Sequence, residues 1–214
     1  MSDSSVSPTD LAKRLIRAAT ACGARGWCEG TGGNFSAVVR RDPLQLLISR
    51  SGTTKYRLSL DDLILINADG HPIEPETGRP SDESTLHATI AATTGAGSVL
   101  HTHSVPGTLL GEHFVAAGGF RIRGYEMLKG ISGVASHEDE VFVPVIENSQ
   151  DMDTLGESFQ EVHGSNSGLW GFLVAGHGLY VWGKDVEQAQ RHAEIFEFLF
   201  DCVLRRTELR PFEG

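Results

Sequence analysis

Two histidines separated by one residue follow a short apolar run, and this pattern constrains the fold more than any other in the chain. Residues 97–100 are Gly-Ser-Val-Leu, a sequence typical of a buried β-strand, and His101 and His103 come next. Successive side chains of a strand point to opposite faces, so both imidazoles are expected on one face with ring nitrogens that can converge on one ion. The pattern predicts a strand that residues 105–107 terminate and that carries half of a metal site. The alternative is a pair of half-buried histidines that bond to backbone carbonyls.

A third histidine offers another ligand. His177 lies between two glycines in residues 171–183, a segment whose pattern predicts two short strands flanking the histidine. Glycine allows a positive φ or a close approach to another element, which suits a side chain aimed into a crowded site. Three neutral imidazoles with an open fourth position suit Zn²⁺, although Fe, Ni and Cu also bind imidazole. The alternative is a hairpin turn that merely contains a polar residue.

Composition limits the partners of this chain. Its 214 residues, of which 40% are hydrophobic and 21% charged, are ordinary for a globular protein with one sizeable core. The formal net charge of −10, with 18 scattered Lys and Arg residues, argues against a nucleic-acid partner. No run approaches the ~20 apolar residues that cross a bilayer, so no membrane partner is expected. The composition therefore favours a small molecule as the partner.

The cysteines and the N-terminus are typical of a protein in a reducing compartment. Cys22, Cys28 and Cys202 have neither an even count nor the Cys-x-x-Cys spacing of a thiolate zinc site. Residues 1–8 lack the basic and apolar regions of a secretory signal, and we expect them to be disordered. The predicted location is cytoplasmic, and the predicted domain covers residues 9–214.

Helical and strand patterns alternate along the chain. The spacing of apolar residues predicts a first helix that Thr9 caps, a second that begins near Ser81, and a long amphipathic helix over about 184–206. Strands are predicted at 35–40, 44–49, 63–66, 97–100 and 120–123, in addition to the two that flank His177. Because no long polar linker interrupts this alternation, the sequence predicts one α/β domain.

Two polar loops and two glutamates could serve a reaction beside the metal. The backbone N–H groups of residues 30–36 could form a nest for a small anion, and residues 49–55 add hydroxyls and two cations. Glu83, and Glu126 with Lys129 close by, are candidates for proton transfer beside a metal. The alternatives are ordinary polar loops and surface carboxylates.

Five motifs in a fixed order carry a resemblance to a known family. They are Thr-Gly-Gly-Asn at 31–34, Ser-Gly at 51–52, Pro-Ser-x-Glu at 80–83, His-Thr-His-Ser at 101–104 and Gly-His-Gly at 176–178. In this order, over about residues 9–206, the chain resembles the class II aldolase and adducin family. The resemblance implies a three-layer α/β/α domain with a central mixed, largely antiparallel sheet. It also implies a homotetramer with active sites near subunit interfaces.

Residues 124–131 resemble one branch of that family, which dehydrates a ketose phosphate in methionine salvage. The implied reaction converts 5-methylthioribulose 1-phosphate to 2,3-diketo-5-methylthiopentyl 1-phosphate and water, with one Zn²⁺ per subunit. The implied metal ligands are His101, His103 and His177. The implied phosphate and substrate contacts are Thr31, Gly33, Asn34, Ser51, Gly52, Ser81 and Lys129. Asp82 stands where relatives have serine, and it is left out of these contacts because an anion repels phosphate.

The two glutamates distinguish two reactions within the family. The resemblance implies that Glu126 is the acid/base of a dehydratase, whereas Glu83 would serve a sugar-phosphate aldolase or a 4-epimerase. A non-catalytic, adducin-like interaction module is a further alternative, but it has no reason to keep three metal-ligand histidines. A cupin-type dioxygenase is disfavoured, because no glutamate occurs in residues 104–111.

The other histidines are not expected to be ligands. His87 is predicted on the buried or half-buried face of the second helix, where it would mainly affect stability. The remaining five are predicted to lie in loops or on helix surfaces: His71, His113, His137, His163 and His192.

Overall fold

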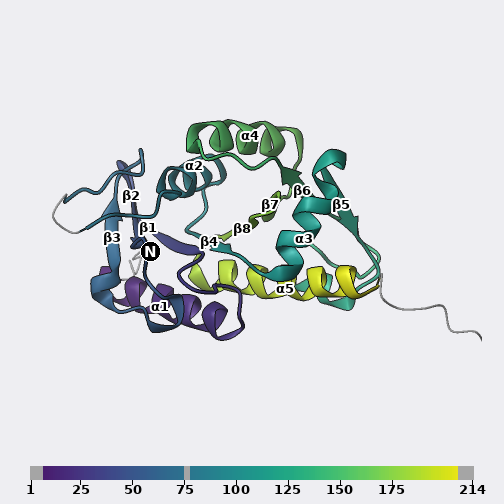
Figure 1. The fold of residues 1–214 in the computed structure, drawn as a ribbon, viewed down its shortest axis with the longest axis horizontal. Helices are drawn as coiled ribbons and strands as arrows, with labels where there is room; N and C mark the ends of the chain where they lie inside the picture. Colours follow the sequence, from purple (N-terminus) through teal and green to yellow (C-terminus); the bar gives the residue numbers. More distant parts are fainter. Residues whose placement is uncertain (1–6, 75–77, 207–214) are drawn as a thin grey trace, which may run out of the picture.

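Eight strands form one sheet in residues 7–74 and 78–206, the part of the chain that the computed structural model describes (Figure 1). Their order is β3-β2-β1-β4-β8-β7-β6-β5, and neighbours are antiparallel except for the parallel pair β6 and β7. The strands are β1 (Asn34–Arg41), β2 (Leu44–Ser49), β3 (Leu63–Ile66), β4 (Ser98–Thr102), β5 (Gly119–Ile122), β6 (Val141–Ile146), β7 (Gly171–Val174) and β8 (Gly178–Gly183). The predicted mixed, largely antiparallel sheet is confirmed.

Helices cover both faces of the sheet. The helices α2 (Ser84–Thr94) and α4 (Met152–Ser165) lie above it in Figure 1, and α1 (Pro8–Ala24) and α5 (Val186–Arg206) lie below it. The helix α3 (Val105–Phe114) packs on α5. Short 3₁₀ turns occur at η1 (Lys55–Arg57), η2 (Leu60–Asp62), η4 (Val115–Ala117) and η5 (Glu126–Gly130). The domain therefore has the predicted three-layer α/β/α architecture.

The alternation of side chains along the central strands creates two separate cores. In β4, Leu100 packs with residues of α1, α3 and α5, whereas Val99 packs with residues of α2 and α4. In β8, Val181 joins the first core, and Tyr180 and Trp182 join the second. Both faces of these strands are thus buried, which explains the continuous apolar run at 179–182 in β8. This burial fixes which strand residues can face a site at the strand ends.

Two helices begin at other residues than the sequence predicts. Ser7, not Thr9, caps α1, because its hydroxyl accepts the backbone N–H of Asp10 at 3.1 Å and Pro8 suits the first turn. The second helix begins at Ser84 rather than near Ser81. The predicted disorder concerns residues 1–8, of which 1–6 lie outside the described residues. Within the described part, no helix is both long and apolar enough to cross a membrane.

The prediction of a surface or loop position was wrong for His192. This residue of α5 is buried, with its Nδ1 at 2.8 Å from the Trp182 carbonyl and its Nε2 accepting the Ser132 backbone N–H at 3.2 Å. Both ring nitrogens are therefore satisfied by backbone groups of packed elements. Of the other four histidines, His71, His113 and His137 are exposed, and His163 is half-buried.

Candidate metal centre

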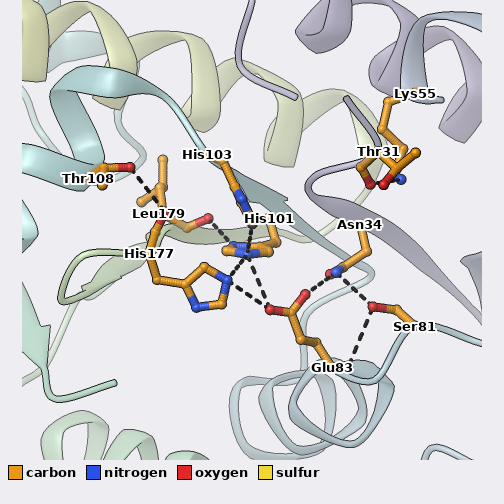
Figure 2. A network of polar contacts seen from close by, with 10 residues as sticks. All are labelled: Thr31, Asn34, Lys55, Ser81, Glu83, His101, His103, Thr108, His177 and Leu179. Atoms are coloured by element: carbon orange, nitrogen blue, oxygen red, sulfur yellow. Dashed lines mark hydrogen bonds and ion pairs between the residues drawn. The ribbon is translucent and has the colours of Figure 1, made fainter. Parts of the chain in front are cut away.

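The three predicted histidines converge at one end of the central strands (Figure 2). His101 lies in β4, His103 follows it, and the turn between β7 and β8 carries His177. The Nε2 atom of His101 lies 2.7 Å from Nε2 of His103 and 3.2 Å from Nε2 of His177. Each ring thus presents one nitrogen to a common point.

The glycines around His177 hold its turn against β4. Gly176 has a φ of +61°, and a side chain at Gly178 would collide with the backbone carbonyl of Thr102. The hydroxyl of Thr108 donates to the His177 carbonyl at 3.1 Å. Both of the properties expected of these glycines, a positive φ and a close approach to another element, are therefore present.

Burial keeps His101 and His103 neutral. The side chain of His101 is fully buried, and this burial lowers the pKa of His101 well below its ordinary value. Burial is also the main cause of the lowered pKa of His103, and the nearby His177 adds to it. Because Nδ1 of His101 lies 2.9 Å from the Leu179 carbonyl, it must donate its proton there, so its Nε2 carries a lone pair.

A carboxylate faces the same point. Oε1 of Glu83 lies 3.0 Å from Nε2 of His177 and 3.5 Å from Nε2 of His101. The side-chain amide of Asn34 donates to Oε2 of Glu83 and, at 3.0 Å, to the hydroxyl of Ser81. Burial acts to raise the pKa of Glu83, but the hydrogen bonds that its carboxylate accepts from His177 and the Asn34 amide act to lower it, and that pKa lies well below the usual range. Glu83 is therefore ionised.

These four residues fit a divalent cation. Their ligand atoms all lie within 4.8 Å of one another. Nε2 of His101 has a single lone pair, yet two imidazole nitrogens and a carboxylate oxygen approach it. A proton can satisfy only one of these approaches, whereas a cation at the common point would satisfy all of them. A set of imidazole nitrogens and one carboxylate oxygen suits Zn²⁺ and related first-row ions.

Some of the predicted substrate contacts adjoin this cluster. Asn34 and Ser81 contact each other beside Glu83. Gly33 has a φ of +74°, and a side chain there would collide with the His101 carbonyl, so its loop lies directly against the metal strand. Thr31, Ser51 and Gly52 are exposed on the two polar loops.

Glu126 and Lys129 lie apart from the cluster within one chain. Both are exposed on η5, where they form an ion pair, and Nδ1 of His137 lies 3.6 Å from Oε2 of Glu126. In the described residues, no polar contact joins either side chain to the four residues of the cluster, which are Glu83, His101, His103 and His177. The structure therefore places the two candidate acid/base residues in different surroundings.

Two buried charged residues close to the site are not among the residues predicted from the sequence. Lys55, on η1, is only 1% exposed and donates from Nζ to the backbone carbonyls of Thr31 at 2.9 Å and Thr53 at 2.7 Å. Glu197 is 3% exposed and accepts the hydroxyl of Thr102 at 2.6 Å. A signal existed for Glu197, since it lies four residues after Ala193 and three before Phe200 in the apolar stripe of α5.

Comparison with known proteins places the chain in a family. Residues 13–204 match the model of the "Class II Aldolase and Adducin N-terminal domain" family. The chain is 38% identical over 197 residues to a methylthioribulose-1-phosphate dehydratase of Sorangium cellulosum, with 92% of each chain covered. It is 41% identical over 196 residues to the protein of that name from Pectobacterium atrosepticum, with 91% of this chain and 94% of that one covered.

Solved structures share the fold at lower identity. L-fuculose-1-phosphate aldolase from Thermus thermophilus superposes with a TM-score of 0.73 at 23% identity, covering 95% of this chain and 98% of that one. A sugar-phosphate aldolase from Thermotoga maritima gives a TM-score of 0.72 at 19% identity, with 96% and 99% covered. The fold, the ordered motifs and the histidine cluster agree with the family match. The chain belongs to the class II aldolase and adducin family.

Proposed function

We propose that this chain is a zinc-dependent methylthioribulose-1-phosphate dehydratase. The observation that carries the proposal is the convergence of three histidine nitrogens and the ionised Glu83 on one point. The names of relatives at 38–41% identity over more than nine tenths of the chain support the substrate. The proposal includes a homotetramer with one Zn²⁺ per subunit, a phosphorylated ketose as the partner and a cytoplasmic location.

The residues present would divide the work of holding the metal and the substrate. His101, His103 and His177 would hold Zn²⁺, and Thr31, Asn34, Ser51, Gly52 and Ser81 would offer donors to the substrate phosphate. A bound Zn²⁺ would supply Lewis-acid stabilisation of the negative charge that develops on the substrate oxygens when the C3 proton leaves. Dehydration then requires a base at C3 and release of the C4 hydroxyl as water.

The surroundings of the two glutamates favour different roles. A carboxylate whose pKa lies well below its usual range is a weak base, so Glu83 suits a metal ligand better than proton removal. We assign proton removal at C3 to Glu126, in the segment that resembles the dehydratase branch. Its exposed position on η5 suits a contribution across the subunit interface of the expected tetramer.

A sugar-phosphate aldolase is the second candidate. It is favoured by the position of Glu83 in the cluster and by the fold shared with the two aldolases. Cleavage of the C3–C4 bond would pass through the same kind of charged intermediate, with the base acting on the C4 hydroxyl instead of the C3 proton.

Product identification separates the two candidates. Zinc-loaded protein is incubated with methylthioribulose 1-phosphate and, in parallel, with fuculose 1-phosphate and ribulose 1-phosphate. The proposal expects a diketone, lighter than the substrate by one water, from the methylthio substrate alone. Release of an aldehyde from any of the three substrates, with no diketone, would establish the aldolase instead.

A further inference from the structure

A buried lysine connects the two loops that carry the proposed phosphate contacts. The Nζ atom of Lys55 donates to the carbonyls of Thr31 and Thr53, which belong to the first and second polar loop respectively (Figure 2 shows the contact with Thr31). One nitrogen reaches both carbonyls, so the loops are held side by side. The exposed residues Ser51 and Gly52 directly precede Thr53, and the backbone at Gly52 adopts a φ of +73° in open space.

The charge of this lysine has no ion-pair partner in the described residues. Its two hydrogen-bond acceptors are neutral carbonyls, and no carboxylate of the described part forms an ion pair with it. Burial lowers the pKa of Lys55, while the more distant carboxylates of Glu83 and Asp62 act to raise it. Burying an unpaired ammonium is unfavourable, and a neutral amide could bridge the same carbonyls. The charge itself therefore needs an explanation.

We propose that Lys55 is a positioning residue that holds the two loops together and supplies the positive charge for a phosphate bound between them. The phosphate would provide the counter-charge that the folded chain lacks at this place. An ammonium has three N–H donors, and two of them are used on the carbonyls. Lys55 thus acts through the loops and through its field, not by contact with the reacting carbons. This inference rests on the proposed function, since it gives the phosphate of that substrate its counter-charge.

The affinity for inorganic phosphate tests the inference without any turnover. Lys55→Gln keeps a donor for the carbonyls but removes the charge, and Lys55→Met removes both. Calorimetry with the metal-loaded protein should show a Kd for phosphate that rises by roughly 10- to 100-fold in both variants, as expected for losing a charge-assisted interaction. Lys13→Gln, which removes the same charge from an exposed position on α1, should leave the Kd unchanged.

Kinetics and metal content separate this role from a purely structural one. The neutral variants should bind metal as the wild type does and should raise KM more than they lower kcat. Lys55→Arg keeps the charge and should restore part of the phosphate affinity. An unchanged phosphate Kd in a folded Lys55→Gln protein overturns the inference. So does a wild type that does not bind phosphate, or a failure of both neutral variants to fold, which would make Lys55 a structural residue.

The outcome is distinguishable from failure of the proposed function. If the wild type does not dehydrate methylthioribulose 1-phosphate but binds phosphate in a manner that depends on Lys55, the proposed function is wrong and the role of Lys55 as counter-charge is supported. If the wild type dehydrates the substrate and Lys55→Gln keeps its phosphate affinity, only the inference about Lys55 is wrong.

Discussion

The ring of Tyr180 stacks on the ring of His101, with 3.9 Å between the ring centroids and 11° between the ring planes. Tyr180 is fully buried in β8, and the backbone carbonyl of its neighbour Leu179 accepts the proton on Nδ1 of His101. One strand therefore fixes both the plane and the tautomer of a proposed ligand. Groups that orient a ligand in this way tune metal affinity.

We predict that Tyr180→Leu weakens metal binding by roughly 10- to 100-fold, because the imidazole loses the surface that fixes its plane. Tyr180→Phe keeps the stacked ring and should bind metal with nearly wild-type affinity. Competition with a chromogenic chelator measures both affinities. Equal affinities in the two variants would show that stacking does not orient His101.

Glu197 should make stability depend on pH near neutrality. Burial raises the pKa of Glu197 from an ordinary value of 4.5 to about 7, against the hydrogen bonds from Ser104 and Thr102. The folded chain therefore keeps a proton that the unfolded chain loses, so stability falls as pH rises from about 4.5 to 7. The full loss, reached above pH 7, amounts to about 3 kcal/mol.

Glu197→Gln should remove this component of the pH dependence. Urea unfolding of the variant and the wild type at several pH values gives the difference in unfolding free energy, which should shift in favour of the variant as pH rises. Glu157→Gln, at an exposed position of α4, serves as the control and should show a constant difference. A constant difference for Glu197→Gln as well would refute the assigned pKa.

His87→Ala should affect stability and spare the metal. His87 is fully buried in α2, its Nδ1 lies 2.8 Å from the hydroxyl of Ser36, and burial lowers its pKa to about 4. Removing the ring leaves a cavity and takes the nearer of two hydrogen-bond partners from the Ser36 hydroxyl, which should lower the unfolding free energy by roughly 2–4 kcal/mol. Denaturant unfolding and metal analysis of the folded variant test this. Loss of metal from folded His87→Ala protein would contradict it.

Glu126→Gln and Glu83→Gln should impair different properties of the protein, turnover in the first variant and metal binding in the second. Glu126→Gln should keep metal and substrate binding while kcat falls by roughly 10²- to 10⁴-fold, as expected for the loss of a general base. Glu83→Gln should mainly weaken metal binding, and excess zinc should restore part of its activity. Exchange of the C3 proton with deuterated solvent, followed in both variants, locates the base. Normal exchange in Glu126→Gln with none in metal-saturated Glu83→Gln would transfer the role to Glu83.

Local patterns were enough to predict the histidine cluster and an α/β domain, whereas the three layers and the mixed, largely antiparallel sheet were implied by the resemblance to a known family. The two-residue period of a strand put His101 and His103 on one face, and the glycines around His177 indicated a crowded turn. One local signal, the start of α3, was missed. Ser104 accepts the N–H of Gly107 at 3.0 Å and starts this helix together with Pro106 in its first turn. The sequence pattern of residues 105–107 predicts only the end of a strand.

The partners of the two buried charges could not be predicted from the sequence, for a physical reason. Lys55 forms a hydrogen bond with Thr31, from which it is separated by 24 positions in the sequence, and Glu197 forms one with Thr102 across a separation of 95 positions. These contacts depend on packing between distant elements, which no local period records, although the apolar stripe of α5 does place Glu197 on the buried face of its helix. Lys55 in particular lies in a polar loop, where a lysine is normally exposed.

The metal content and turnover of His103→Ala test the central claim, that the histidine cluster is a catalytic metal centre. The account predicts about one metal ion per wild-type chain, because the three histidines and Glu83 form a single cluster of ligand atoms. His103→Ala should lose both the ion and the dehydration of methylthioribulose 1-phosphate, whereas His113→Ala, which removes an exposed imidazole, should keep both. Wild-type metal content and turnover in folded His103→Ala protein would contradict the account.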